Sequence, residues 1–265
     1  MKVIILAAGQ GERLRPLTKN IPKCMIDFFG KSLLERQIET FRKCGITDIV
    51  VVTGYCDDKI KLDEITKIKN EKFMTTNMVE SLFTAKEEFD DCIIVSYGDI
   101  VFEIEIIQNL INSLYDISVV IDKNWTELWK VRFDEPLDDA ESLILDENGV
   151  ILDIGQKVTN IEDIQGQYIG LMKFQNNGIE NIKEFYLKMK ELSSLGSNPL
   201  NPNLPFEKSY MTDFLQGLIH NGCKLNSVVT KNGWLEIDSL HDYNLYKKLN
   251  SDKVLKKFVS FEDYS

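Results

Sequence analysis

The sequence predicts an α/β fold in which helices flank a Rossmann-like, mixed and mainly parallel sheet. Short apolar runs, typical of strands that are buried on both faces, recur through the first half of the chain. Segments with helical periodicity separate these runs, and such alternation favours parallel pairing. A chain of 265 residues suits one domain, so we expect residues 1–265 to fold as a single unit.

The first half of the chain supplies the alternating elements. We expect strands at residues 2–6, 46–53, 92–96 and 117–121. We expect helices at residues 32–44, 57–68, 78–88 and 103–114. Ser32 can cap the first helix, and Gly45 stands where a helix commonly ends. Ligands of such sheets gather beyond the carboxyl ends of the strands, and the loop after residue 6 lies at one of these ends.

After about residue 122 the pattern changes to one with hairpins and longer loops. Residues 141–145 and 150–154 flank Asp-Glu-Asn-Gly, a sequence that favours a tight turn between two strands. We expect further strands at residues 167–174, 224–229 and 233–237, and helices at residues 179–192, 211–220 and 239–249. A loop rich in Ser, Asn and Pro is expected at residues 193–205.

Composition limits the classes of partner. The net charge of −11 and the pI of about 4.8 disfavour general binding to nucleic acid or to an anionic membrane. A polyanion therefore needs a local basic site or a metal ion. The five cysteines are odd in number and lack metal-ligand spacing, which is typical of free thiols in a reducing compartment. Without a signal peptide or a run of about 20 apolar residues, a soluble cytoplasmic protein is expected.

The first strand runs directly into a loop that combines flexible backbone with fixed positive charge. Gly9 and Gly11 can adopt positive φ, and successive N–H groups there can form an anion-binding nest. Arg13 and Lys23 add cations suited to phosphate. The loop is not a dinucleotide fingerprint, because Leu14 stands where the third glycine belongs, and it lacks the Gly-Lys-Ser/Thr of a P-loop. From these residues alone, a phosphate site and a solvated surface loop both stay open.

The stretch LAAGQGERLRPLTKNIPKCMI at residues 6–26 resembles the signature of nucleotidyltransferases that activate sugar phosphates and related phospho-compounds. The signature reads L-A-A-G-x-G-x-R-L, then P-x-T, then P-K, and every position is present in order. The resemblance implies the nucleotide-diphospho-sugar transferase type of fold. It also implies that the loop backbone borders the base and ribose of a nucleoside triphosphate, while the arginine and the lysine hold its phosphates. These roles fall on Leu6, Ala8, Gly9, Gly11, Arg13 and Lys23.

Two acidic segments are candidates for a metal site. Asp99 follows a buried strand. Glu236 and Asp238 lie two positions apart, so on a strand they share a face, and Ile237 points the other way into the core. Either segment alone is more simply an ordinary acidic turn. Nucleotidyl transfer normally needs Mg²⁺, which prefers carboxylate ligands, and the resemblance implies that Asp99, Glu236 and Asp238 hold it. The Glu-x-Asp spacing is similar to the phosphocholine cytidylyltransferase branch of the family.

Two further segments resemble family segments that border the nucleotide base. Gly54 follows the second strand, and Asn77 and Ser81 lie at the start of the helix expected at residues 78–88. The resemblance implies that Asn77 and Ser81 read the base, since a buried polar pair rejects bases that leave it unpaired. Asn77 is nearly as well suited to capping the helix, and both roles are compatible.

Residues of about 122–210 are expected to form an acceptor-binding elaboration. Their segment DKNWTELWKVRFDEPLDDAESL resembles cytidylyltransferases that attach phospho- or phosphono-amino compounds to bacterial surface polysaccharides. The resemblance implies acceptor contacts from Lys123, Trp129, Arg132 and Tyr168. It also implies that Lys157 holds the acceptor phosphate and so takes part in catalysis. From the residues alone, the segment is equally a packed flap over the sheet edge.

The implied reaction joins CTP to a phosphorylated or phosphonylated acceptor and gives a CMP-linked acceptor and pyrophosphate. Phosphoglutamine, phosphocholine and alkylphosphonates are the implied acceptors, used to modify a bacterial capsule or other surface polysaccharide, with Mg²⁺ as cofactor. Because dimers occur in the family, the resemblance also allows a homodimer. Two alternatives stay open: a thymidylyl- or uridylyltransferase acting on sugar 1-phosphates, and a nucleotide-binding protein without catalytic activity.

Overall fold

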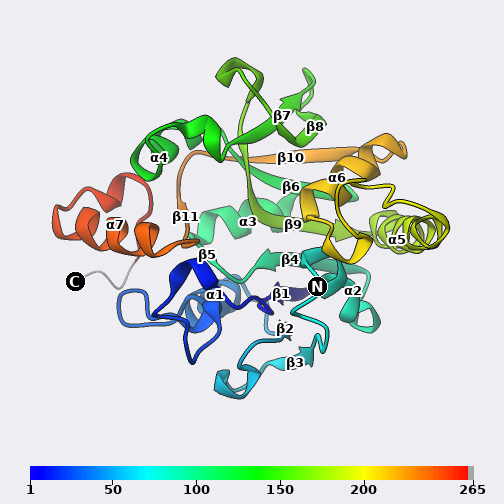
Figure 1. Ribbon diagram of the computed structural model, residues 1–265. Helices are drawn as coiled ribbons and strands as arrows, with labels where there is room; N and C mark the ends of the chain where they lie inside the picture. The colour runs from blue at the N-terminus through cyan, green and yellow to red at the C-terminus, as the bar shows by residue number, and fades with distance from the viewer. Residues whose placement is uncertain (262–265) are drawn as a thin grey trace.

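A nine-stranded mixed sheet forms the centre of the computed structural model, which describes residues 1–261 (Figure 1). Its strand order is β3-β2-β1-β4-β9-β6-β10-β8-β7, and β5 pairs with β11 in a separate two-stranded ribbon. The strands of the sheet are β1 (Lys2–Leu6), β2 (Ile49–Thr53), β3 (Thr66–Lys69), β4 (Cys92–Tyr97), β6 (Ile117–Asp122), β7 (Glu141–Leu145), β8 (Val150–Lys157), β9 (Gln167–Gln175) and β10 (Leu225–Thr230). The ribbon consists of β5 (Ile100–Phe102) and β11 (Trp234–Glu236).

Parallel pairing dominates the amino-terminal half of the sheet. β1 lies between β2 and β4 and is parallel to both, and β3 extends this parallel set beyond β2. β9 enters the sheet between β4 and β6 and is antiparallel to both. β10 is parallel to β6, and β8 and β7 continue the far edge in antiparallel fashion. The predicted α/β class with a mixed sheet is confirmed, and its parallel character belongs chiefly to the half that carries β1 and β4.

Helices cover both faces of the sheet (Figure 1). One face carries α1 (Leu33–Lys43), α3 (Ile104–Asn112), α4 (Trp125–Arg132) and α7 (Leu240–Ser251), and the other carries α2 (Met78–Thr84), α5 (Asn177–Leu195) and α6 (Met211–His220). In β1, Val3 and Ile5 belong to the first core, while Ile4 belongs to the second, because successive side chains point to opposite faces. This double burial explains the continuous apolar runs of the sequence. None of the helices within residues 1–261 combines the length and hydrophobicity that a bilayer crossing requires.

Helix α1 begins where the sequence predicts. Ser32 Oγ accepts a hydrogen bond from the Glu35 N–H at 3.2 Å, and Glu35 Oε2 accepts one from the Ser32 N–H at 2.7 Å. The two bonds form a capping box, which satisfies backbone donors that the first turn of a helix leaves unpaired.

The helix expected at residues 57–68 is wrong. A short 3₁₀ turn at Asp57–Lys59 and strand β3 replace it. β3 pairs in parallel with the outer edge of β2. The backbone groups on that edge of β2 thereby gain hydrogen-bond partners, which a helix at residues 57–68 would not provide. Pairing between distant segments outweighs a weak helical periodicity here.

The topology places at one edge of the sheet the loops that the sequence predicts to bind a ligand. Because β1, β2 and β4 are parallel, their carboxyl ends lie at the same edge. The β5–β11 ribbon adds a segment from late in the chain, since Glu236 lies opposite Ile100 in its register. The Ile237 N–H then donates to the Asp99 carbonyl oxygen at 2.9 Å. The ribbon therefore places Asp238, just after β11, beside Asp99, just before β5.

Candidate active site

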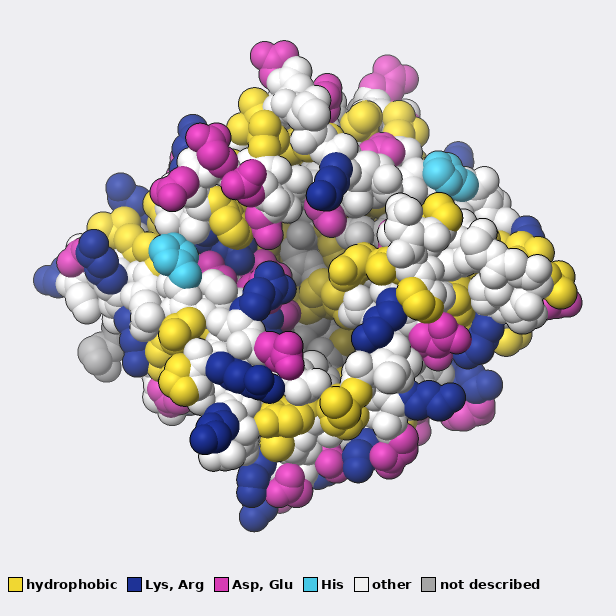
Figure 2. Space-filling view, in the orientation of Figure 1, with side chains coloured by type: hydrophobic (Ala, Val, Ile, Leu, Met, Phe, Trp, Pro, Cys, Tyr) yellow, Lys and Arg dark blue, Asp and Glu magenta, His cyan; other side chains and the backbone are white. Residues whose placement is uncertain are grey.

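This edge of the sheet carries a cleft of about 390 Å³, which lies between the loop after β1 and helix α2. Figure 2 shows the molecule hollowed near the centre of this face, with basic, acidic and hydrophobic side chains around the hollow. The cleft is lined by Leu6, Ala7, Ala8, Gly9, Gly11, Glu12, Arg13, Lys23, Cys24, Phe73, Thr76, Asn77, Met78, Ser81, Tyr97, Gly98, Asp99 and Asp238. This set includes every residue predicted for the nucleotide and its phosphates except Gly54, and two of the three predicted metal ligands.

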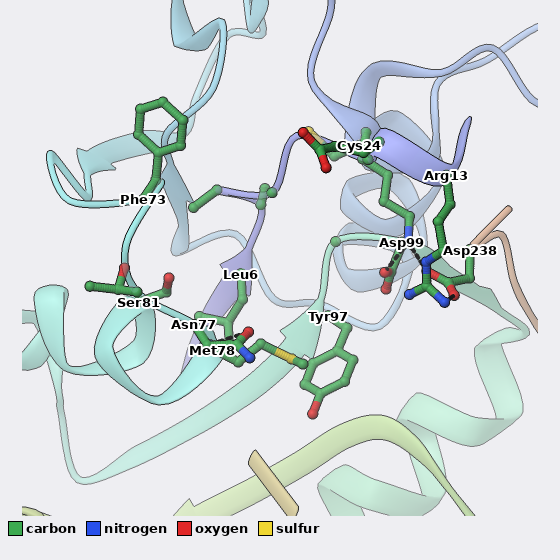
Figure 3. Close-up of a pocket in the computed structure, with 18 residues that line it drawn as sticks. Leu6, Arg13, Cys24, Phe73, Asn77, Met78, Ser81, Tyr97, Asp99 and Asp238 are labelled. Carbon is green, nitrogen blue, oxygen red and sulfur yellow. Dashed lines mark hydrogen bonds and ion pairs between the residues drawn. The ribbon is translucent and has the colours of Figure 1, made fainter. Parts of the chain in front are cut away.

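The cations and the carboxylates gather at one end of this cleft (Figure 3). Lys23 Nζ lies 2.6 Å from Asp99 Oδ2 and 2.7 Å from Asp238 Oδ1. Arg13 Nη1 lies 2.6 Å from Asp238 Oδ2. The Lys23 side chain is 13% exposed and the Arg13 side chain is 72% exposed, so one cation is fixed among acids and the other is open to a ligand. Burial opposes the charge on Lys23, but the carboxylates of Asp99 and Asp238 outweigh this and raise its pKa.

The glycine loop allows this arrangement. Gly11 has φ +65°, in the left-handed region that other residues rarely adopt. A Cβ at this position would lie 3.0 Å from Lys23 Cβ, so the absence of a side chain lets the loop pack against the stem of Lys23. Thr18 Oγ1 donates to the Gly11 carbonyl at 2.7 Å and holds the turn in place.

Asp99 and Asp238 fit a site for Mg²⁺. Both carboxylates converge on Lys23, and Asp99 Oδ1 is buried without a hydrogen-bond partner among the described residues. Proteins commonly hold Mg²⁺ through one or two carboxylates, with substrate phosphates and water as its other ligands. Within residues 1–261, no three His, Cys, Asp or Glu side chains are grouped as a complete metal site. A nucleotide would therefore have to supply further ligands.

The other end of the cleft is formed by α2 and the segment before it. Figure 3 shows Phe73 and Ser81 at this end and Leu6 between them and the charged residues. Asn77 caps α2, as one of the two predicted roles requires, because its side chain accepts from the Met78 N–H at 2.9 Å. Ser81 Oγ accepts from Asn70 Nδ2 at 3.1 Å, and its hydroxyl retains a donor for a ligand.

Gly54 does not line the cleft but shapes its wall from behind. A Cβ at Gly54 would lie 2.7 Å from the Ala8 carbonyl oxygen and 2.6 Å from Phe73 Cβ. Real Cβ atoms do not approach so closely, so only glycine lets Phe73 pack against the loop after β1. Gly54, which was predicted to border the base, therefore affects the cleft only through the position of Phe73.

A second cleft of about 200 Å³ opens beside the first. It is lined by Arg13, Met78, Tyr97, Trp129, Asp139, Glu141, Gln167, Tyr168, Ile169, Gly170, Tyr210, Thr212, Trp234, Glu236 and Asp238. Arg13, Asp238, Met78 and Tyr97 line both clefts, so the charged cluster stands at their junction. A ligand in either cleft would meet this cluster.

The second cleft contains two of the predicted acceptor residues, Trp129 and Tyr168. The Tyr168 ring meets the Tyr97 ring edge-on with centroids 5.7 Å apart. Sequence reasoning missed Asp139 and Glu141, which lie in a turn and at a strand end where nothing distinguishes them from surface acids. Loss of hydration, with repulsion from Asp139, raises the pKa of Glu141 to about 7.

Glu236, the third predicted metal ligand, faces the second cleft. Its Oε2 accepts a hydrogen bond from Arg132 Nη2 at 3.0 Å. Desolvation raises the pKa of Glu236 to about 7; the nearby aspartates act in the same direction and Arg132 acts against them.

Arg132 does not lie where an acceptor could contact it, so the predicted acceptor role is corrected. Its side chain is 1% exposed, and Arg132 Nε donates to Asp242 Oδ1 at 3.0 Å. Its Nε and Nη2 are committed to carboxylates of the protein, and its Nη1 is buried without a hydrogen-bond partner among the described residues.

Lys123 and Lys157, the other predicted acceptor cations, are exposed and lie among the lining residues of neither cleft. Lys157 ends β8 and stands opposite Glu141 in the pairing with β7, so it is one strand away from the second cleft. Lys123 follows β6, and its N–H donates to the Thr230 carbonyl at 3.0 Å.

Comparison with known proteins shows which family the chain resembles. Residues 3–139 match the family model of the MobA-like NTP transferase domain. A CTP:phosphoglutamine cytidylyltransferase of Campylobacter jejuni is 39% identical over 254 residues, which cover 91% of this chain and 97% of the relative. A choline-phosphate cytidylyltransferase of Streptococcus pneumoniae is 29% identical over 207 residues, 72% of this chain and 89% of the relative.

A solved structure agrees in fold over nearly the whole chain. The CTP:phosphocholine cytidylyltransferase from Streptococcus pneumoniae superposes with a TM-score of 0.70 at 24% identity, covering 94% of this chain and 98% of that one. This likeness shows the fold, whereas the family match and the identity to the Campylobacter jejuni protein show the family. The chain belongs to the MobA-like NTP transferase family and is a nucleotidyltransferase.

Proposed function

We propose that this enzyme is a cytidylyltransferase that joins CMP from CTP to a phosphorylated acceptor of the phosphoglutamine class. The identity to a CTP:phosphoglutamine cytidylyltransferase over nearly the full length of both chains supports this choice. The observation that carries the proposal is the junction of the two clefts, where Arg13 and Lys23 meet Asp99 and Asp238.

In the proposed reaction CTP lies in the first cleft, with its base toward α2 and its phosphates along the loop after β1. An oxygen of the acceptor phosphate attacks the α-phosphorus of CTP, and the bond from that phosphorus to the β-phosphate oxygen breaks. The products are the CMP-linked acceptor and pyrophosphate. No general base is needed, because the attacking oxygen is already ionised. Arg13 and Lys23 offset negative charge on the α-phosphate and on departing pyrophosphate, so catalysis consists mainly of positioning and electrostatics.

Asp99 and Asp238 are the residues proposed to hold Mg²⁺. When bound there with CTP, the ion would neutralise phosphate charge that protein cations alone leave unbalanced. Glu236 is a weaker candidate for this role because Arg132 already engages its carboxylate.

The second cleft is the proposed acceptor site. Trp129 and Tyr168 line it. Lys157 stays a proposed contact for the acceptor phosphate, because it lies opposite Glu141 in the β7–β8 strand register and Glu141 lines the cleft. Lys123 stays a more distant candidate. Residues 122–210 supply most of the cleft's wall, although β9 within this range also lies at the centre of the sheet.

We also propose a cytoplasmic location and a role in modifying surface polysaccharide. Cys24, Cys44, Cys56, Cys92 and Cys223 are free thiols, which suits a reducing compartment. A homodimer stays a prediction.

A pyrophosphate-release assay tests the proposed function. CTP, UTP, dTTP, GTP and ATP are each combined with phosphoglutamine, phosphocholine, 2-aminoethylphosphonate and hexose 1-phosphates in the presence of Mg²⁺. We expect release with CTP and phosphoglutamine, and much less with the other pairs. Release with dTTP or UTP and a hexose 1-phosphate would instead identify a sugar nucleotidyltransferase. Nucleotide binding without release from any acceptor would identify a non-catalytic binding protein.

A further inference from the structure

A buried ion pair lies behind the charged cluster and joins three elements that are distant in the sequence. Arg132, near the end of α4, donates from Nε to Asp242 Oδ1 at 3.0 Å on α7. The same guanidinium donates from Nη2 to Glu236 Oε2 at 3.0 Å at the end of β11. The side chains of Arg132 and Asp242 are 1% and 3% exposed.

Asp242 carries this pairing on to the main chain of Asp238. Its Oδ2 accepts from the Asp238 N–H at 3.1 Å and from the Ser239 N–H at 2.9 Å. Ser239 Oγ accepts in turn from the Asp242 N–H at 3.1 Å, which completes the capping box of α7. Arg132 therefore contacts both oxygens of this carboxylate, Oδ1 from Nε at 3.0 Å and Oδ2 from Nη2 at 3.4 Å, and Oδ2 also contacts the backbone of Asp238.

The segment from Glu236 to Asp238 is thus held at both ends. Arg132 holds the side chain of Glu236, and Asp242 holds the N–H of Asp238. Between them, the Ile237 N–H donates to the Asp99 carbonyl at 2.9 Å. These contacts decide where the Asp238 carboxylate stands relative to Asp99.

A role in folding alone does not account for this arrangement. Removing an arginine and a carboxylate from water has a desolvation penalty that often equals or exceeds the attraction between them, so an apolar pair would stabilise the fold as well. Capping α7 needs Asp242 but not Arg132. Only a planar fork of donors can reach Asp242 and Glu236 together.

We propose that Arg132 and Asp242 act as a positioning clamp, which fixes the Asp238 carboxylate for the Mg²⁺–CTP complex and holds Glu236 in the wall of the second cleft. This inference rests on the proposed function. Neither clamp residue lines the first cleft. They are therefore positioning residues, and their effect should appear in Mg²⁺-dependent binding and in kcat more than in binding of the nucleotide itself.

Calorimetric titration with CTP tests the clamp without acceptor and without turnover. Wild-type protein, Arg132→Lys, Arg132→Met and Asp242→Asn are each titrated with and without Mg²⁺. We expect wild-type protein to bind CTP more tightly when Mg²⁺ is present. We expect the clamp variants to lose most of this gain while keeping the metal-free affinity. Their kcat should fall about 10- to 100-fold, the usual effect of removing a group that orients a metal ligand, with the KM for acceptor within about threefold.

A matched control separates positioning from loss of stability. Arg36 is also a buried arginine; it donates to the carbonyl oxygens of Phe28 and Phe29 and lines neither cleft. Arg36→Lys should lower the Tm but retain the gain in CTP affinity from Mg²⁺. Should Arg132→Met fail to fold, Asp242→Asn still gives a decision, because an asparagine keeps an oxygen that can cap α7.

A folded clamp variant with wild-type kcat and a wild-type gain from Mg²⁺ would overturn the clamp. So would an equal loss of the gain in Arg36→Lys. Failure of wild-type protein itself to bind CTP would refute the proposed function instead, so the two failures are distinguishable.

Discussion

Lys23 and Asp99 lie 76 positions apart in the chain, yet the ammonium nitrogen of one is 2.6 Å from Oδ2 of the other. The same nitrogen reaches Asp238, another 2.7 Å contact across 215 positions. One cation thus bridges both acids that we propose for the magnesium site, and these acids hold the cation beside the proposed phosphate site. The contact joins the start, the middle and the end of the chain in one charged cluster.

Replacing Lys23 by alanine tests the cation. We expect Lys23→Ala to lower kcat at least about tenfold, because a fixed charge beside the reacting phosphates is lost. Steady-state pyrophosphate release measures kcat, and circular dichroism checks that the variant is folded. Lys19→Ala, which removes an exposed lysine of the same loop, is the control and should stay within about twofold of wild type. Normal turnover in folded Lys23→Ala would remove Lys23 from the mechanism.

Arg13 should contribute to binding more than to stability. Its side chain is 72% exposed, and exposed ion pairs contribute only about 0–1 kcal/mol to folding. Arg13→Ala should therefore leave the free energy of unfolding within about 1 kcal/mol of wild type. Loss of a charged hydrogen bond to phosphate should lower kcat/KM for CTP by about 10- to 100-fold. Arg15→Ala, on the same loop and outside both clefts, is the control; an equal loss there would argue against a specific contact from Arg13.

Two glycines of the loop should respond differently to the same substitution. Gly11→Ala forces a Cβ into a backbone with φ +65° and to within 3.0 Å of Lys23, so the Tm should fall by an amount equivalent to about 1–2 kcal/mol. At Gly9 a Cβ meets nothing within 4 Å, so Gly9→Ala should leave the Tm unchanged and weaken CTP binding instead. Thermal unfolding and calorimetric titration with CTP measure both effects. A larger loss of stability in Gly9→Ala than in Gly11→Ala would contradict this assignment.

Local patterns predicted the elements whose pattern is strong. Strand β1 and helix α6 have the bounds that their apolar periodicities predict, residues 2–6 and 211–220. The helix at residues 57–68 failed because β3 exists only by pairing with β2. The central, antiparallel position of β9 could not be predicted from its own residues either, because it depends on pairing with the distant strands β4 and β6.

The same division applies to the site. Residues of the opening loop and Asp99 could be placed because they follow strands whose ends share one edge of the sheet. The burial of Arg132 could not be foreseen, because it depends on α4 packing near α7. Asp139 and Glu141 carry no local signature, and although both are exposed, their place in the lining of the second cleft distinguishes them from other surface acids.

The acidity of Glu141 makes the stability of the fold depend on pH. Although Glu141 is exposed as a residue, partial desolvation of its carboxylate, with the charges of Asp139 and Asp213, raises its pKa from 4.5 to about 7. The folded protein therefore holds this proton more tightly than the unfolded chain does, and ionising Glu141 destabilises the fold. This penalty grows as the pH rises from about 4.5 to about 7 and is constant above that range.

Glu141→Gln keeps a neutral group at all pH values and should escape this penalty. We expect its Tm to approach that of wild type at pH 5 and to exceed it at pH 8, as measured by thermal unfolding in buffers of equal ionic strength. A difference in Tm that is the same at both pH values would show that Glu141 ionises as freely in the folded protein as in the unfolded chain. The same variant also tests whether Glu141 contacts the acceptor. If it does, added phosphoglutamine should raise the Tm of Glu141→Gln by less than it raises the Tm of wild type.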